Sequence, residues 1–241
     1  MAHFFAAPRL QMEPHHTILL KVAFPERLMK KLVALLFVAL FASVAPSFSS
    51  AADLQAERDY KAIDPPMPSG KGKIEIIEFF SYGCPHCSDF HPYISKWATK
   101  LPKDVSFRRV AVSFNRAPWA RLARIYYTLE STGELAKLDA AVFIALHEQR
   151  MNFTSDESVL TWATQKGADA KKFGDEFASF AIQSKVQRGD QEAVAARIQG
   201  VPALVVDGKY LVQNEAASNF DELLKLTDRV IAKARQERKG K

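Results

Sequence analysis

Residues 74–87 read Ile-Glu-Ile-Ile-Glu-Phe-Phe-Ser-Tyr-Gly-Cys-Pro-His-Cys, and the rest of the chain can be interpreted outward from them. Its first seven residues form a mostly apolar run that is typical of a buried strand. Residues 88–101 follow with Phe90, Ile94 and Trp97 at helical spacing. Cys84 and Cys87, the only cysteines of the chain, therefore lie where a strand is followed by a helix. The free backbone N–H groups and the dipole of a helix N-terminus stabilise a thiolate at that position.

The composition is that of an ordinary globular protein. The 241 residues are 48% hydrophobic and 25% charged, enough for one domain with a sizeable core or one domain with an insertion. The formal net charge of +6 falls to +3 without residues 1–52, and the basic run 235–241 is typical of a solvated tail. We therefore expect no nucleic-acid partner.

The N-terminal region has the pattern of a secretory signal peptide in residues 29–52. Two lysines follow Met29, residues 32–45 form an apolar run too short to span a bilayer comfortably, and residues 50–52 are small. We expect cleavage after Ala51 or Ala52. Residues 1–28 do not fit a basic leader, so we interpret them as a misassigned start and expect translation to begin at Met29.

Export changes how the two cysteines are interpreted. In an oxidising compartment two such thiols persist as a disulfide. A disulfide across only two intervening residues closes a very short loop and constrains the unfolded chain little. The Cys84–Cys87 pair is therefore expected to react rather than to stabilise. A C-x-x-C motif near a βαβ pattern is itself typical of a thioredoxin-like redox centre.

The remaining chain divides into two sheet-forming segments on either side of a helical block. A second strand is predicted at 105–114, and from Pro118 the apolar spacing is helical, with Phe173, Phe177 and Phe180 interpreted as core aromatics. A last helix is predicted at about 190–198. A hairpin around Asp207-Gly208 and an amphipathic helix capped by Asn219 complete the chain. We expect a first thioredoxin-like segment with the CPHC motif in 53–115, a helical domain in 116–189, and a second thioredoxin-like segment in 190–241.

Two segments resemble a known family. Residues 78–87, Glu-Phe-Phe-Ser-Tyr-Gly-Cys-Pro-His-Cys, resemble the active-site segment of the DsbA family, thioredoxin-fold thiol oxidases of bacterial envelopes. Residues 200–203, Gly-Val-Pro-Ala, resemble that family's Val–cis-Pro loop. The resemblance covers residues 53–241 and implies an α/β thioredoxin-like fold with an inserted all-helical domain.

The resemblance also implies a function. The protein would be a periplasmic thiol:disulfide oxidase that donates its Cys84–Cys87 disulfide to reduced exported proteins, with no cofactor besides that disulfide. A DsbB-like membrane quinone reductase would reoxidise it, and we expect a monomer. By resemblance, the pKa of the reactive thiol is strongly lowered and the pair is oxidising.

The CPHC motif supplies most of the expected catalytic residues. Cys84 is the expected nucleophile and Cys87 the resolving thiol, with Pro85 and His86 between them. A histidine in this spacer can give a hydrogen bond or a positive charge to the Cys84 thiolate. The alternative for His86 is an exposed histidine with no partner at the start of a helix.

Three further sites are candidates outside the motif. Glu78 matches the family's buried acid, which takes part in proton transfer at the second cysteine. Strand alternation alone does not prove its burial, so a carboxylate at the rim is the alternative. Arg109 on the adjoining strand is its candidate charge partner. Val201 and Pro202 are expected to form a cis peptide facing the disulfide, beside backbone free to pair with an extended substrate. The alternative is a trans-proline at a strand edge.

Other functions fit the sequence less well. A zinc site could use Cys84, Cys87 and His91, but no fourth ligand is evident, and we expect no metal. Covalent haem attachment needs a histidine directly after the second cysteine, where Ser88 stands. A disulfide isomerase, an envelope reductase and a peptide-binding chaperone with an idle disulfide remain as alternatives.

Overall fold

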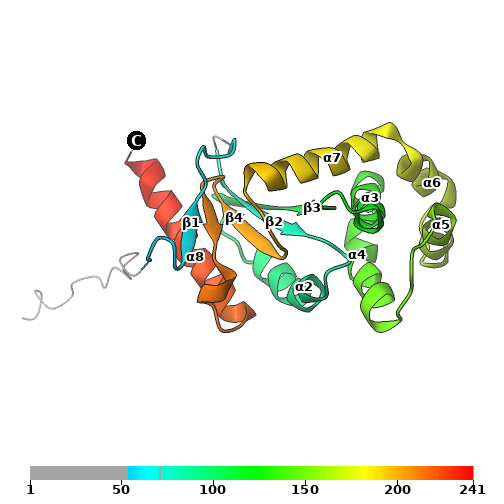
Figure 1. The fold of residues 1–241 in the computed structure, drawn as a ribbon, viewed down its shortest axis with the longest axis horizontal. Helices are drawn as coiled ribbons and strands as arrows, with labels where there is room; N and C mark the ends of the chain where they lie inside the picture. Colours follow the sequence, from blue (N-terminus) through cyan, green and yellow to red (C-terminus); the bar gives the residue numbers. More distant parts are fainter. Residues whose placement is uncertain (1–53, 71, 241) are drawn as a thin grey trace, which may run out of the picture. The chain divides into compact units, whose positions relative to one another are not determined.

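The structure is a computed structural model that describes residues 54–70 and 72–240. The predicted signal peptide and the proposed start at Met29 lie outside these residues. Within them the chain forms a five-stranded sheet with the strand order β1-β5-β4-β2-β3 (Figure 1). β2 and β3 are parallel, and the other neighbouring pairs are antiparallel. The strands are β1 (Tyr60–Ala62), β2 (Ile74–Phe80), β3 (Val105–Ala111), β4 (Ala203–Val206) and β5 (Tyr210–Val212).

The side chains of β2 alternate between two apolar layers, as the period of two in a strand requires. One layer contains Ile76 and packs with the helices α2 (Pro85–Ala98) and α8 (Phe220–Lys239). The other contains Ile77 and packs with the C-terminal end of α7 (Phe180–Ala195). β2 is therefore buried on both faces, which explains its nearly continuous hydrophobic sequence.

A group of helices separates β3 from β4 in the sequence. It consists of α3 (Ala117–Thr132), α4 (Leu135–Phe143), the π-helical turn η2 (Ile144–Glu148), α5 (Asp156–Gln165), α6 (Ala170–Ala178) and α7. Figure 1 shows α7 running from this group back to the sheet. The group has its own apolar core, which continues to Phe80 and the two cysteines. The α/β thioredoxin-like class with a helical insertion is confirmed.

Two expectations for the helical block are wrong. The last helix of this block, α7, begins at Phe180 and not near residue 190, so the expected boundary between 189 and 190 falls inside α7. Ser179 ends α6 and caps α7, its hydroxyl accepting a hydrogen bond from the Ile182 N–H at 3.2 Å. Because the chain turns at this cap, Phe180 leaves the face that holds Phe173 and Phe177, and it is 80% exposed.

The predicted end of the chain is confirmed. Asp207 and Gly208 join β4 to β5 with φ angles of 55° and 64°, the left-handed pair that a tight hairpin requires. A Cβ on Gly208 would lie 2.6 Å from the carbonyl oxygen of Met67, so only glycine fits. A short 3₁₀ turn, η3 (Asn214–Ala216), leads to α8, whose Asn219 cap accepts a hydrogen bond from the Glu222 N–H. No helix in the described part of the chain is long and apolar enough to cross a membrane.

Candidate active site

The C-terminal end of β2 places Cys84 at the start of α2. After Phe80 the chain turns through residues 81–83, where the Cys84 N–H donates to the Ser81 carbonyl at 3.1 Å. Cys84 is the N-cap residue, and Pro85 occupies the first helical position, where its missing N–H costs no hydrogen bond. The first N–H groups of α2 therefore lie around Cys84, as the sequence predicts.

The two cysteines are free thiols with unlike environments. Cys87 is fully buried and Cys84 is 7% exposed. A hydrogen bond from the Cys87 thiol, with further help from backbone N–H groups, lowers the pKa of Cys84 to about 6. Burial raises the pKa of Cys87 far above its usual range, and donation to Cys84 raises it further. At pH 7, Cys84 is therefore about nine-tenths ionised while Cys87 holds its proton.

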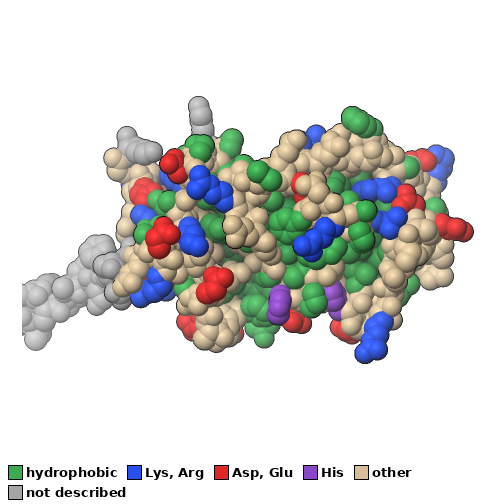
Figure 2. All heavy atoms as spheres, viewed as in Figure 1, with side chains coloured by type: hydrophobic (Ala, Val, Ile, Leu, Met, Phe, Trp, Pro, Cys, Tyr) green, Lys and Arg blue, Asp and Glu red, His purple; other side chains and the backbone are tan. Residues whose placement is uncertain are grey.

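His86 lies on the exposed side of the motif. Its backbone N–H and its charge both help to lower the pKa of Cys84, although the Cys87 thiol contributes most. His86 also lines a cavity of about 480 Å³ together with Tyr93, Pro202 and Phe220. Figure 2 shows hydrophobic side chains gathered in the middle of this view of the molecule, with histidine side chains beside them.

The loop before β4 closes over the nucleophile. The Val201–Pro202 peptide is cis, as predicted. In its thiol form Cys84 donates a hydrogen bond from Sγ to the Val201 carbonyl at 3.2 Å. The Asn214 side-chain amide donates to the Pro202 carbonyl at 2.7 Å and holds the loop in place. Residues 117 positions apart in sequence thus meet at one sulfur atom.

Glu78 is fully buried, which excludes the alternative of a carboxylate at the rim. The parallel register of β2 and β3 pairs it with Arg109, whose Nε donates to Glu78 Oε2 at 2.8 Å. The other oxygen, Oε1, has no hydrogen-bond partner within residues 54–70 and 72–240. Burial raises the pKa of Glu78, and the Arg109 charge offsets this only partly. The negative charge of Glu78 in turn helps to raise the pKa of Cys87.

Asp139 and His91 also belong to the site. The sequence did not predict that either residue would lie beside Arg109. The Arg109 guanidinium also donates from Nη1 to Asp139 Oδ2 at 2.7 Å. Asp139 lies in α4, and its carboxylate further accepts a hydrogen bond from the Tyr82 hydroxyl at 2.5 Å. The His91 Nε2 lies 2.7 Å from Asp139 Oδ2. One arginine thus links two carboxylates, one from the sheet and one from the helical insertion.

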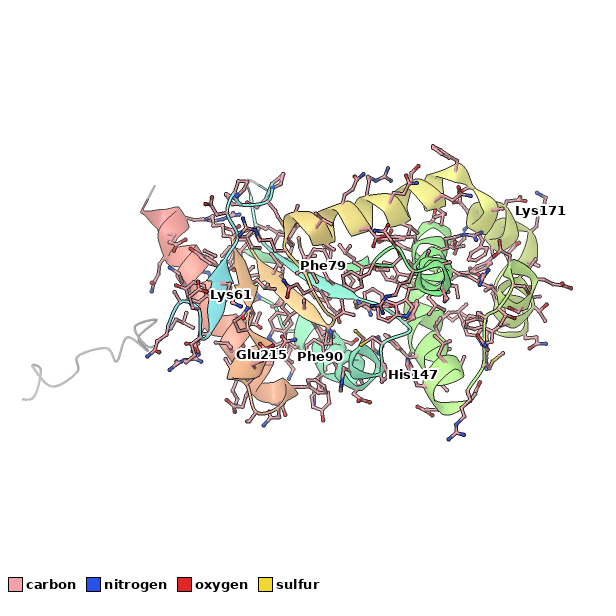
Figure 3. The ribbon with its side chains drawn as sticks, viewed as in Figure 1. Lys61, Phe79, Phe90, His147, Lys171 and Glu215 are labelled. Carbon is pink, nitrogen blue, oxygen red and sulfur yellow. The ribbon has the colours of Figure 1, made fainter. Side chains whose placement is uncertain are left out.

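The four-residue spacing from Cys87 to His91 could have predicted that His91 lies near the site, whereas no local sequence pattern marks Asp139 as a site residue. His91 follows Cys87 by four residues, which places both on one face of α2. Asp139 is an ordinary polar position of an amphipathic helix until the fold brings it to Arg109. His147, on η2 (labelled in Figure 3), bonds through Nε2 to the Tyr82 carbonyl at 2.7 Å. In the described ranges no group of three or more His, Cys, Asp or Glu residues could hold a metal ion.

Comparison with known proteins agrees with this geometry. Residues 75–225 match the family model of the DSBA-like thioredoxin domain. The thiol:disulfide interchange protein DsbA of Bordetella parapertussis is 39% identical over 191 residues, which cover 78% of this chain and 90% of the relative. The Pseudomonas aeruginosa DsbA is 36% identical over 208 residues, covering 86% and 98%.

Solved structures show the same similarity. The crystal structure of Pseudomonas aeruginosa DsbA superposes with a TM-score of 0.75 at 38% identity, covering 79% of this chain and all of that one. The oxidoreductase NmDsbA1 of N. meningitidis superposes with a TM-score of 0.70 at 25% identity, covering 79% and 98%.

Proposed function

Because the chain belongs to the DsbA-like thioredoxin family and is a thiol:disulfide oxidase, we propose that Cys84–Cys87 is the disulfide that it donates to reduced exported proteins. The observation that carries this assignment is the opposite displacement of the two thiol pKa values. The pKa of Cys84 is lowered to about 6, and that of Cys87 is raised. A stabilised Cys84 thiolate favours the reduced form of the pair and so makes the disulfide a good oxidant.

The reaction starts with attack of a substrate thiolate on Cys84 Sγ of the oxidised protein. The Cys84–Cys87 bond breaks, Cys87 leaves as a thiolate, and a disulfide forms between the substrate and Cys84. A second substrate thiolate then attacks the substrate sulfur of this mixed disulfide, and Cys84 leaves as a stable thiolate. The substrate gains one disulfide, and the protein gains two electrons.

Glu78 is proposed to move the proton of Cys87. The leaving Cys87 sulfur is buried, so its negative charge is costly until a proton arrives. Burial raises the pKa of Glu78, so its carboxyl group can hold a proton at a higher pH than an exposed glutamate. Oε1, which has no hydrogen-bond partner among the described residues, is the atom available to release that proton and to accept it again during reoxidation.

The substrate is proposed to bind as an extended chain beside Val201 and Pro202. The cavity lined by His86, Tyr93 and Phe220 adjoins this loop and can receive apolar side chains of an unfolded protein. We further propose that the protein acts in the periplasm as a monomer, with a DsbB-like membrane quinone reductase restoring the disulfide.

A stoichiometric oxidation assay tests the function. The oxidised protein is mixed with an equal amount of a reduced, unfolded model protein that contains two cysteines. We expect one substrate disulfide per protein reduced, and none with Cys84→Ala. A protein that reduces insulin disulfides but leaves the reduced substrate unchanged would be a reductase. Faster repair of mispaired disulfides than oxidation of thiols would support the isomerase alternative.

A further inference from the structure

We propose that Arg116 and Trp119 form a second substrate contact beside Cys84, one that favours polypeptides with an acidic residue next to the reactive cysteine. This contact, which we name the α3 ledge, consists of Phe114, Arg116 and Trp119. The inference rests on the proposed oxidase function and specifies which substrates it prefers.

Trp119 lies directly against the residue before the nucleophile. A Cβ built on Gly83 would lie 3.0 Å from Trp119 Nε1 and 3.0 Å from Leu122 Cδ1. The indole therefore occupies the space that a side chain at position 83 would fill, and it packs against the same core as Cys84. Trp119 is only partly buried, so part of this residue is accessible beside Gly83, the residue before the nucleophile.

The sheet topology places the α3 ledge and the apolar cavity on opposite sides of Cys84. Cys84 follows β2, which lies between β4 and β3. The cavity borders Pro202, just before β4, and Phe220, after β5. The ledge follows β3 on the other side. In a substrate bonded to Cys84, the chain on one side of the substrate cysteine thus extends toward the cavity, and the chain on the other side extends toward Arg116 and Trp119.

The loop that carries the ledge is held in a strained shape. Phe114 and Asn115 have φ angles of 48° and 58°, two consecutive left-handed residues without a glycine. Asp190 of α7 accepts hydrogen bonds from the Ser113 N–H at 2.7 Å, from the Ser113 hydroxyl and from the Phe114 N–H at 3.1 Å. Such strain persists only where the surroundings impose it, and it is concentrated at functional sites.

Arg116 supplies the charge of the ledge. Its guanidinium lies 5.2 Å from the Trp119 ring centroid, and the residue is exposed. Among the described residues it has no ion-pair partner, whereas Arg121 and Arg124 of α3 both pair with Asp156. An arginine held over an indole presents a flat fork of N–H donors that matches a carboxylate. An aspartate or glutamate near the substrate cysteine is the complementary group.

Peptide oxidation rates test the proposal. Four reduced peptides share one cysteine and differ in a single charged residue, glutamate or lysine, placed two positions before or after that cysteine. The rate of mixed-disulfide formation with the oxidised protein is measured for each, at low and at high salt. The variants are Arg116→Glu and, as a matched control, Lys171→Glu, which lies at the outer end of the helical group (Figure 3). Thermal unfolding confirms that both variants fold.

The expected result is a glutamate preference of about two- to five-fold on one side of the cysteine only, the range of an exposed ion pair. Arg116→Glu should reverse that preference, Lys171→Glu should preserve it, and high salt should reduce it. Equal rates for glutamate and lysine peptides would overturn the proposal, as would equal preferences on both sides. A protein that forms a mixed disulfide with none of the peptides would instead contradict the proposed function.

Discussion

Replacing Cys87 by alanine tests which interaction lowers the pKa of Cys84. The Cys87 thiol is the largest contributor to this lowering, ahead of the helix N–H groups and the His86 charge. Cys87→Ala removes the thiol donor and leaves the helix N-terminus, His86 and the Val201 loop in place. The variant therefore separates the contribution of the second cysteine from that of the helix.

The expected size follows from the strength of a hydrogen bond to a charged group. Such a bond contributes about 1.5–3 kcal/mol, and one pH unit of pKa corresponds to about 1.4 kcal/mol. Loss of the donor should therefore raise the pKa of Cys84, which is about 6 in the native protein, by about one to two pH units. At pH 7 the thiolate fraction should fall from about nine-tenths to between one-half and about one-tenth.

The assay is a pH titration of thiolate ultraviolet absorbance, supported by the rate of alkylation at each pH. Cys87→Ser is the matched control, because its hydroxyl can still donate to the thiolate and should keep the pKa of Cys84 close to the native value. If Cys87→Ala titrates at the native pKa, the thiol donor is unimportant. The helix N-terminus and His86 would then account for the whole lowering of the Cys84 pKa.

Three further predictions concern the buried charges and the packing around the site. Glu78→Gln should lower the pKa of Cys87, because it removes a negative charge that disfavours the thiolate. The same variant should turn over more slowly. Thiol titration measures the pKa, and the oxidation assay measures turnover. Asp139→Asn should reduce the free energy of unfolding in urea by about 2–3 kcal/mol, because a mostly buried arginine loses one of its two carboxylates. Gly189→Ala should cost about 1–3 kcal/mol in the same assay, because its Cβ would lie 2.9 Å from a backbone carbonyl of β3.

Each of these predictions has a result that contradicts it. Unchanged thiol pKa values and turnover in Glu78→Gln would remove the proton-transfer role. For Asp139→Asn the control is Asp175→Asn in an exposed pair with Lys171, and equal effects would show that the buried network is unimportant. For Gly189→Ala the control is Gly174→Ala, whose Cβ meets only ordinary contacts at 3.6 Å. Gly174→Ala should raise the free energy of unfolding by up to about 1 kcal/mol. If Gly174→Ala and Gly189→Ala both lowered it, the close contact at Gly189 would not be the cause.

Local sequence signals are sufficient where neighbours along the chain determine the structure. The step from an apolar strand to a helix at Cys84 depends only on residues within one turn, and the sequence predicts it. The Asp207-Gly208 hairpin and the Asn219 cap are equally local. Phe180 shows the limit of periodicity, because the helical spacing from Phe177 continues in sequence while Ser179 ends one helix and begins another.

Contacts between distant elements can be predicted only in part. The pairing of Glu78 with Arg109 can be proposed because both lie on neighbouring strands, although the sequence does not give the register. The contact of Asp139 with Arg109 cannot be predicted, because it depends on how the helical insertion packs against β3. The α3 ledge likewise depends on Gly83 and Trp119 meeting across 36 residues, a contact that neither position indicates alone.

The oxidising power of the Cys84–Cys87 pair is measured most directly by its equilibrium in graded glutathione redox buffers. A Cys84 thiolate stabilised by Cys87, the start of α2 and His86 should hold the pair reduced even where oxidised glutathione predominates. His86→Pro should move this equilibrium toward the disulfide, making the protein a weaker oxidant. A pair that is already oxidised in strongly reducing buffers, as in a thioredoxin-like reductase, would contradict the oxidase function and reverse the direction of electron flow.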